Sequence, residues 1–161
     1  MIGNDIVDLA LARKESNWKR NRFLDKIFTK EEQWLITESG NPEIMVWNLW
    51  SRKEAAYKIY NRQTGIRGYF PTQIACFYES STLGTVIIKG NTYYTQTTIS
   101  NDVLHSIAVT KREYFNRIKF LNHKAVIVKI NGIPFLIENQ NTAVKPVSIS
   151  HHGRFCERIT L

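Results

Sequence analysis

The pattern of apolar and polar residues changes near residue 74, from helical spacing before it to strand-like spacing after it. A short strand is expected at the start, over 2–9, where Ile2, Ile6, Val7 and Leu9 supply the apolar side chains. The apolar residues that follow recur with a helical period. They predict helices over 16–27, 30–38 and 42–61.

Two of these helices have well-marked ends. Thr29 and Glu32 form the T-x-x-E pattern of a capping box, in which each side chain accepts a hydrogen bond from the other residue's backbone N–H. Asn41 followed by Pro42 combines an N-cap with a proline at the first helical position. The long helix that begins there is expected to stop before Gly65.

From residue 74 onward the apolar segments are short and rich in β-branched and aromatic residues, which is typical of strands. The expected strands cover 74–78, 85–89, 92–99, 104–110, 125–130, 134–137 and 147–150. Gly90-Asn91 and Asn131-Gly132 predict hairpin turns, and 113–123 predicts a short helix or a loop. Early helices and late strands favour an α+β fold with helices packed on an antiparallel or mixed sheet.

Length and composition fit one globular domain over 1–161. The 22 Lys and Arg against 14 Asp and Glu give a net charge of +8, which favours a nucleic acid, a phosphorylated ligand, an acidic protein or an anionic membrane as partner. No apolar run approaches the ~20 residues that span a bilayer. Cys76 and Cys156 form no disulfide or metal pattern, and no basic leader is present, so a cytoplasmic protein is expected.

The helix expected over 42–61 carries the most informative pattern. Trp47, Trp50, Glu54 and Lys58 fall on one helical face because of their 3-4-4 spacing. Two interpretations stay open at this point. Glu54 and Lys58 form either a surface ion pair worth ~0.3–0.5 kcal/mol, or a charged pair in a cleft walled by the two tryptophans.

Two further segments carry polar groups in apolar surroundings. Asp5 interrupts the first strand and lies either on a solvated face or at a metal, while Asp8 faces the opposite side. The segment 148–155 (SISHHGRF) ends a predicted strand with hydroxyl and imidazole groups, which suits either a polar strand end or an anion site. A hydrolase is not favoured because no G-x-S-x-G motif occurs. The adjacent His151 and His152 splay apart and make a poor zinc pair.

Four segments together resemble the 4′-phosphopantetheinyl transferase superfamily. They are GNDIVD at 3–8, FLDKIFTKEEQ at 23–33, WSRKEAAYK at 50–58 and SISHHGRF at 148–155. The family pattern has G-x-D-[IV]-x-[ED], then F…R-x-[FL]-T-x-x-E, then [WF]-x-x-K-E-[AS]-x-x-K, with an accompanying S-x-S-H element. The C-terminal position of S-x-S-H resembles the small holo-acyl-carrier-protein synthase type. This chain is longer than such members usually are, and the excess at 80–129 is a possible insertion.

The resemblance implies transfer of the phosphopantetheine arm of coenzyme A to a serine of an apo carrier protein, with release of adenosine 3′,5′-bisphosphate. By carry-over from the motifs, Asp5 and Glu54 hold Mg²⁺, a hard cation that prefers oxygen ligands. Lys58 contacts a phosphate as a point charge. Either Glu54 or a metal-bound water takes the serine proton.

The same resemblance assigns coenzyme A phosphates to Ser150 and His151, with possible help from Lys53. The partner is an apo acyl or peptidyl carrier protein, which is generally acidic, and not a nucleic acid or a membrane. Fatty-acid, polyketide and peptide synthesis all stay open as the pathway. A homo-oligomer is expected, with a trimer favoured, because the small family members place the site between subunits.

The basic residues near the N-terminus suggest how such a carrier docks. On a helix over 16–27, Lys19, Arg22 and Lys26 share one face. This face is either a docking strip for an acidic carrier or a solvated surface; the neighbouring basic residues are Arg13, Lys14 and Arg20.

Two rival classes of function remain open. One is a basic nucleic-acid-binding module, although Asp5 and Glu54 would repel phosphates without a metal. The other is an inactive homologue that only binds the carrier. The presence of Asp5, Glu54 and Lys58 together argues against that second rival.

Overall fold

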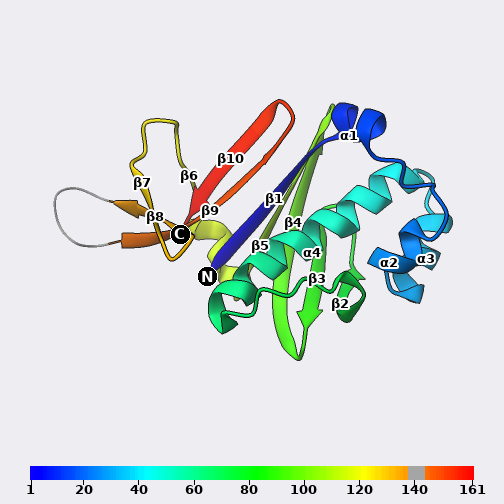
Figure 1. Cartoon of the computed structure of the whole chain (residues 1–161), viewed down its shortest axis with the longest axis horizontal. Coiled ribbons are helices and arrows are strands. Elements are labelled where there is room, and N and C mark those ends of the chain that lie inside the picture. Colours follow the sequence, from blue (N-terminus) through cyan, green and yellow to red (C-terminus); the bar gives the residue numbers. More distant parts are fainter. Residues whose placement is uncertain (138–143) are drawn as a thin grey trace.

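A computed structural model describes residues 1–137 and 144–161 and shows helices packed against one of two neighbouring antiparallel sheets (Figure 1). The helices are α1 (Leu9–Glu15), α2 (Phe23–Ile27), α3 (Lys30–Thr37) and α4 (Pro42–Thr64), with 3-10 turns at Pro71–Gln73 and Arg112–Arg117. The strands are β1 (Ile2–Asp8), β2 (Ile74–Tyr78), β3 (Leu83–Ile88), β4 (Asn91–Ser100), β5 (Val103–Val109), β6 (Lys119–Phe120), β7 (Ile127–Ile130), β8 (Ile133–Ile137), β9 (Val144–His152) and β10 (Phe155–Thr160). The predicted α+β class is confirmed, with every described strand pair antiparallel.

The first sheet has the strand order β1-β5-β4-β3-β2, and the second has the order β6-β10-β9-β8-β7. The N-terminal strand β1 pairs with β5, from Ile2 opposite Val109 to Asp8 opposite Val103. β1 is therefore an edge strand of the first sheet, and β9 of the second sheet lies next to that edge. The segment 80–129 supplies β3, β4 and β5, so it contributes to the sheet that carries β1.

Helix α4 covers the first sheet and supplies much of the core. Val46, Leu49, Ala55 and Ile59 are buried completely against the strands. Gly3 allows this helix to approach β1, because a Cβ atom there would collide with the Ala55 carbonyl oxygen. The glycine of the G-x-D pattern therefore fixes the distance between the strand that carries Asp5 and the helix that carries Glu54.

The capping predictions for α3 and α4 are confirmed. Both hydrogen bonds of the Thr29–Glu32 capping box are present. Asn41 caps α4, which runs one turn further than predicted before Gly65 ends it with a left-handed φ of 71°.

The two hairpin turns also form. Asn131 and Gly132 adopt φ angles of 52° and 81°, as a tight hairpin requires. The other turn lies one residue earlier than predicted, at Lys89 and Gly90. The segment expected as a short helix or a loop contains the second 3-10 turn and the two-residue strand β6. Strands β6 and β10 were not predicted from the sequence.

The helix predicted over 16–27 is wrong for most of its length. Residues 16–22 form turns, and α2 contains only five residues, because Arg22 adopts a left-handed conformation with φ of 63° immediately before it. The apolar side chains that suggested the helix instead pack individually on the core, among them Trp18 and Phe23. Consequently Lys19, Arg22 and Lys26 do not share a helical face.

The structure has a helix, α1, where the sequence pattern predicted the end of a strand. It begins one residue after Asp8, whose carboxylate accepts the backbone N–H of Leu11 as an N-cap. Among the described helices, none combines the length and apolar composition needed to cross a membrane.

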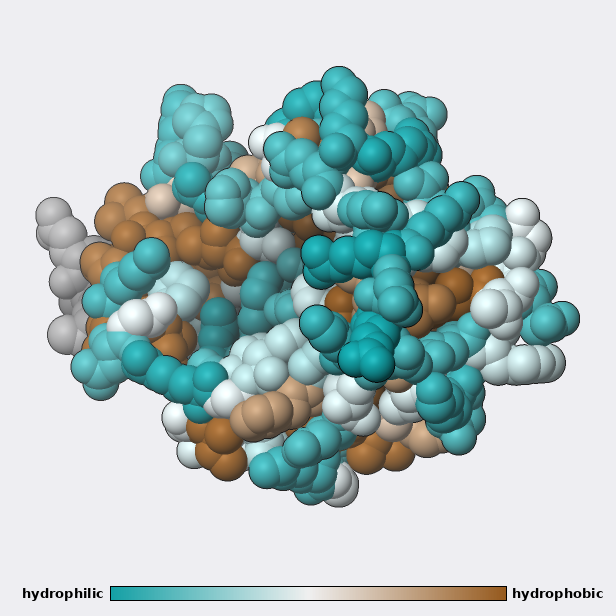
Figure 2. Space-filling view, turned by 45° about the vertical axis from the view of Figure 1, so that its right-hand side comes forward, coloured by the Kyte–Doolittle hydropathy of each residue, from teal (hydrophilic) through white to brown (hydrophobic). Residues whose placement is uncertain are grey.

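The outer surface differs between the two sheets. Large apolar side chains are exposed over the second sheet, and apolar surface gathers on the left of Figure 2, where Figure 1 shows β6 to β9. The exposed residues there are Phe120, Val126, Ile130, Ile137 and Val144. The paired positions of Ile137 and Val144 make part of this surface continuous across two strands.

Candidate active site

Side chains of β9 join the two sheets along the free edge of β1. Three backbone amides of β1 donate hydrogen bonds to β9: Asn4 to Ser148 Oγ at 2.8 Å, Ile6 to Ser150 Oγ at 3.1 Å and Asp8 to His152 Nδ1 at 2.9 Å. The spacing of two residues on both strands follows from the strand period. This seam between the sheets places the side chain of Asp5 opposite α4.

Asp5 lies between a serine and a lysine in this seam. Ser150 Oγ donates to Asp5 Oδ1 at 2.9 Å, and Lys58 Nζ lies 3.6 Å from the same oxygen. Lys58 Nζ also donates to the carbonyl oxygens of Asn4 at 2.6 Å and Ile149 at 3.3 Å. Lys58 therefore spans both strands of the seam.

The surface ion pair considered for Glu54 and Lys58 does not form. Among the ion pairs within the described residues, Lys58 pairs with Asp5, and the side chains of both are largely buried. Trp47 and Trp50 do line a cavity, but the charged residue of that cavity is Asp5, and Lys58 lines a different one.

The environment disfavours negative charge on both carboxylates. Burial raises the pKa of Asp5, against the opposing effects of Lys58 and Ser150. Burial and then the nearby Asp5 charge raise the pKa of Glu54 to about 7. Carboxylate oxygens in such surroundings are the kind of donor that a hard divalent cation such as Mg²⁺ prefers.

No cluster of three or more His, Cys, Asp or Glu side chains able to hold a metal occurs within residues 1–137 and 144–161. A metal held by Asp5 and Glu54 would therefore need water or substrate oxygens as its other ligands. Magnesium commonly keeps several such ligands.

Tyr69 is a site residue that the sequence analysis did not identify. Its hydroxyl is buried without a partner in regular hydrogen-bond geometry, and burial together with the Glu54 charge raises its pKa far above the ordinary value. The ring packs edge-on against Tyr57 at 4.8 Å and Trp50 at 5.8 Å between centroids. Tyr69 therefore stays neutral and forms an aromatic wall beside Glu54.

The predicted contact between Lys53 and coenzyme A is contradicted by the structure. Lys53 is fully buried on the opposite side of α4 and forms an ion pair with Glu32. Its ammonium also donates to the carbonyl oxygens of Ile27 and Pro71, at 2.9 Å each. These bonds satisfy its three donors, so Lys53 connects α3 and α4 and is not available to a ligand.

Two cavities adjoin the Asp5–Lys58 pair. We call the first the indole pocket; it has a volume of about 140 Å³, and its lining includes Asp5, Ala12, Trp47, Trp50, His151 and His152. We call the second the basic groove; it has a volume of about 350 Å³, and its lining includes Lys58, Arg62, Lys129, Pro134 and Ile149. His151 thus shares a cavity with Asp5, whereas Ser150 Oγ is engaged by Asp5 and Ile6.

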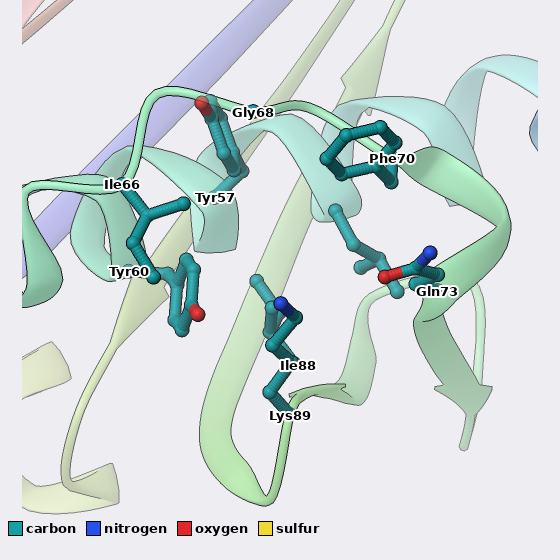
Figure 3. A pocket seen from close by; sticks show the side chains of 9 residues that line it. Tyr57, Tyr60, Ile66, Gly68, Phe70, Gln73, Ile88 and Lys89 are labelled. Carbon is teal, nitrogen blue, oxygen red and sulfur yellow. The ribbon is translucent and has the colours of Figure 1, made fainter.

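A third cavity lies beyond the end of this site. Figure 3 shows it between Tyr57, Tyr60, Phe70 and Ile88, beneath the chain that leaves α4. Its volume is about 20 Å³, enough for one water molecule and too small for a part of coenzyme A.

An ion pair fixes the end of the β9–β10 hairpin near the indole pocket. Arg154 donates to both oxygens of Asp8, at 2.8 Å from Nε and 2.7 Å from Nη2, and holds the pKa of that carboxyl well below its ordinary value. Gly153 has a left-handed φ of 55° and leaves no room for a Cβ beside Asp8. Asp8 and Asp5 have different side-chain partners, and the Asp8 backbone N–H donates to His152 Nδ1.

Comparisons with known proteins find a matching family and a relative. The family model described as 4′-phosphopantetheinyl transferase superfamily matches residues 1–118. A holo-[acyl-carrier-protein] synthase of Caldanaerobacter subterraneus subsp. tengcongensis is 30% identical over 89 residues, which cover 55% of this chain and 68% of that protein.

Two solved structures share the fold. Holo-[acyl-carrier-protein] synthase from Neisseria meningitidis has a TM-score of 0.56 at 20% identity and covers 69% of this chain and 97% of its own. The Thermotoga maritima synthase has a TM-score of 0.52 at 15% identity, and the match covers 75% of this chain and 76% of that one. With the family match extending over most of the chain, this protein belongs to the 4′-phosphopantetheinyl transferase superfamily.

Proposed function

We propose that this chain transfers the 4′-phosphopantetheine group from coenzyme A to a serine hydroxyl of an apo carrier protein in a Mg²⁺-dependent reaction. Adenosine 3′,5′-bisphosphate is the other product. The observation that carries the proposal is the pair of buried carboxylates, Asp5 and Glu54, next to Lys58 and the basic groove. Family membership supports the same reaction and does not favour nucleic-acid binding.

The residues divide the work between metal and phosphate binding. Asp5 and Glu54 would hold Mg²⁺, which neutralises charge on the oxygens of the pyrophosphate when it is bound. Lys58, Arg62 and Lys129 line one groove and supply positive charge for coenzyme A phosphates. His151 reaches the same centre from the indole pocket.

Glu54 takes the proton in this proposal. The serine oxygen forms a bond to the β-phosphorus of coenzyme A, the bond to the bridging oxygen breaks, and the serine proton moves to a Glu54 oxygen. The bridging electron pair leaves with adenosine 3′,5′-bisphosphate. A carboxylate placed within hydrogen-bond reach of the serine hydroxyl can accept its proton directly. Tyr69 lies beside the Glu54 carboxylate, with its hydroxyl buried.

A transfer assay tests the proposal directly. The protein is incubated with coenzyme A, Mg²⁺ and apo carrier proteins from fatty-acid, polyketide and peptide synthesis. Mass spectrometry is expected to show one phosphopantetheine added to a carrier serine, and chelation of the metal is expected to stop the addition. No mass gain on any of these carriers, with folded protein that binds coenzyme A, would overturn the proposal.

We also propose an acidic carrier as partner and a homo-oligomer, with a trimer favoured, as the active form. The net charge of +8 and the basic residues of 13–26 support an acidic partner. The apolar surface over the second sheet supports self-association.

A further inference from the structure

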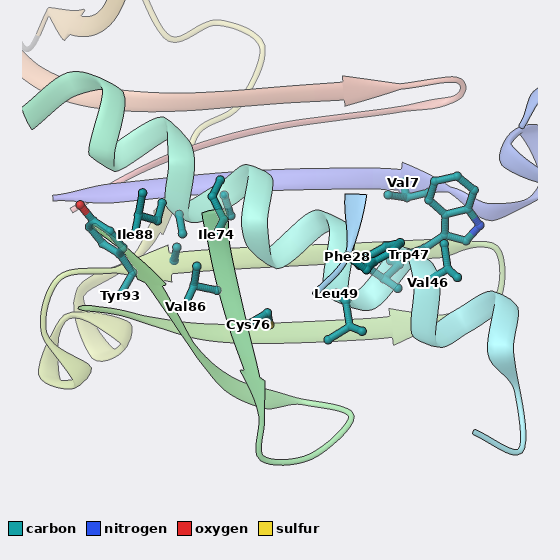
Figure 4. Packing of buried hydrophobic residues seen from close by; sticks show 14 of the residues in the cluster. Val7, Phe28, Val46, Trp47, Leu49, Ile74, Cys76, Val86, Ile88 and Tyr93 are labelled. Atoms are coloured by element: carbon teal, nitrogen blue, oxygen red, sulfur yellow. The ribbon is translucent and has the colours of Figure 1, made fainter. Parts of the chain in front are cut away.

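Trp47 carries a buried hydrogen-bond donor that has no acceptor. Its side chain is 7% exposed, and its indole Nε1 has no partner among the described residues. Figure 4 shows the indole at one end of the core cluster, next to Val7 of β1. Trp47 and Val7 both line the indole pocket. A buried donor left unpaired is unfavourable, so an oxygen acceptor that reaches this N–H gains a hydrogen bond that the free protein lacks.

The charges around the pocket decide which kind of oxygen fits. The charged residue in its lining is Asp5, accompanied by His151 and His152, and no Lys or Arg lines it. The basic groove on the other side has three cations. A phosphate therefore suits the groove, whereas a neutral hydroxyl or carbonyl oxygen suits the pocket.

The geometry of phosphoryl transfer indicates where that neutral group comes from. The attacking and leaving oxygens lie roughly in line on opposite sides of phosphorus. If the nucleotide leaves through the basic groove on the Lys58 side, the hydroxyl enters from the side of the indole pocket. The pocket is also bounded by Ala12 and Ser16, next to the exposed basic segment 13–26.

We infer that the indole pocket receives the acceptor segment of the carrier protein. In it, the Trp47 N–H donates a hydrogen bond to a peptide carbonyl oxygen next to the reactive serine. Trp47 thereby selects and orients the acceptor rather than coenzyme A. This inference rests on the proposed function, because it names a contact of that reaction's second substrate.

Indole N–H resonances give a direct test that does not depend on turnover. The chain has four tryptophans, and Trp47→Phe assigns the resonance of Trp47 in the ¹H–¹⁵N spectrum. The wild-type protein is titrated separately with the apo carrier that the transfer assay modifies, with coenzyme A, and with adenosine 3′,5′-bisphosphate, all without metal. A downfield shift of the Trp47 signal with the carrier alone is expected. A shift with coenzyme A only, or no shift on carrier binding, would overturn the inference.

Kinetics test the same contact in the working enzyme. Trp47→Phe is expected to raise the KM for the carrier about 10-fold, the factor that corresponds to one lost hydrogen bond, with the KM for coenzyme A little changed. Replacement of Trp47 by benzothienylalanine removes the N–H and keeps the ring size, so it separates the hydrogen bond from packing. Trp34→Phe, on the exposed face of α3, is the matched control.

The two proposals fail in different ways. If the wild-type protein transfers nothing to any carrier, the proposed function is wrong. If it transfers normally and the benzothienylalanine form has an unchanged KM for the carrier, only the role of Trp47 is wrong.

Discussion

At Glu54, burial and the neighbouring Asp5 charge both raise the carboxyl pKa, whereas at Asp5 burial raises the pKa against the opposing effect of Lys58. We predict that Asp5→Ala and Glu54→Ala each lower the turnover of carrier modification by about 10²-fold or more at saturating Mg²⁺. Steady-state transfer rates measure the effect. Neither change removes a core contact, so the thermal unfolding midpoint should not fall enough to explain the loss.

Glu38→Ala is the matched control for these variants, because Glu38 is exposed at the end of α3. It should retain wild-type turnover and the same dependence on Mg²⁺. An Asp5 or Glu54 variant with substantial turnover would remove that residue from the proposed metal site.

His105 provides a pH-dependent contribution to stability next to the seam. Burial and then Lys58 lower its pKa to about 4, and Asn4 Nδ2 donates to the neutral ring at 3.1 Å. The unfolded chain therefore takes up the proton first as pH falls. The stabilising contribution is complete above pH 6.5 and is lost progressively towards pH 4, by about 2–3 kcal/mol.

We predict that His105→Gln flattens the decline in unfolding free energy between pH 6.5 and pH 4. Urea unfolding at a series of pH values measures it. His123→Gln is the control, since His123 is exposed and should leave the decline unchanged. An equally steep decline in both variants would show that other groups cause it.

The sequence identified individual site residues, but it did not reveal which side chains they contact. Asp5, Glu54, Lys58 and His151 come from short motifs; the structure brings Asp5, Lys58 and His151 to adjoining cavities and Glu54 within the influence of the Asp5 charge. The role expected for Lys53 fails because helical position alone does not reveal the buried Glu32 that pairs with it.

Among the aromatic residues at the site, the sequence identified those on a helix but not the one in a loop. Trp47 and Trp50 were predicted as a cleft wall from their helical spacing, and they line the indole pocket. Tyr69 lies in a loop without a periodic pattern, so nothing in the sequence placed its hydroxyl beside Glu54.

At the scale of elements, the alternation of Ser148, Ser150 and His152 has a structural meaning that the sequence did not reveal. These side chains replace the neighbouring strand that β1 lacks on its outer edge. The partners lie 144 residues apart, and only tertiary packing brings them together. The sequence shows only the strand that carries this motif and not the neighbouring β1. The motif was therefore interpreted as an anion site or a polar strand end.

We predict that Ser148→Ala and Ser150→Ala each lower the free energy of unfolding by ~1–3 kcal/mol, because each leaves a buried backbone N–H without an acceptor. Ser150→Ala also frees an oxygen of Asp5 and should reduce turnover more strongly than Ser148→Ala. Urea unfolding and transfer rates, measured on both variants, separate the two effects. Equal losses of turnover would show that Ser150 acts on stability alone.

The basic segment 13–26 is a second element whose role depends on the structure. Its cations lie at the end of α1, on turns and on the short α2 rather than on one helical face. We predict that charge reversal at Arg22 and Lys26 together raises the KM for the carrier about 10-fold and weakens its dependence on salt. The KM for coenzyme A should not change, because neither residue lines the basic groove.

Reversal of two distant cations, Lys111 and Lys124, controls for net charge, since both are exposed and lie outside 13–26. If this control raises the KM for the carrier equally, the attraction is general and the basic segment is a solvated surface.

For the whole molecule, local signals predicted most elements but not how they assemble. Caps and turn residues located α3, α4 and the β7–β8 turn, because those interactions are local in sequence. The pairing of β1 with β5 and the division into two sheets depend on contacts between distant segments. The apolar side chains of 16–27 were misleading because they pack on the core from turns and from the five-residue α2 rather than from one long helix.

The apolar surface over the second sheet leads to the prediction about assembly. Val126, Ile137 and Val144 are exposed next to one another, with the Ile137 amide bonded to the Val126 carbonyl oxygen and Ile137 paired with Val144. Burying such a patch in a subunit interface is favourable. We predict a homo-oligomer, with a trimer favoured, and we predict that Ile137→Lys converts it to a monomer with little transfer activity.

Light scattering coupled to size exclusion measures the mass, and transfer rates are recorded on the same samples. Leu83→Lys is the matched control, because Leu83 is 37% exposed and Ile137 is 38% exposed, but Leu83 lies on the first sheet. The control should remain oligomeric and active, since its side chain is outside the proposed interface. If the Ile137 variant keeps the wild-type mass, this patch is not the interface. A wild-type monomer that is fully active at nanomolar concentration would mean that one chain encloses coenzyme A by itself, with 80–129 as the segment able to supply the missing wall.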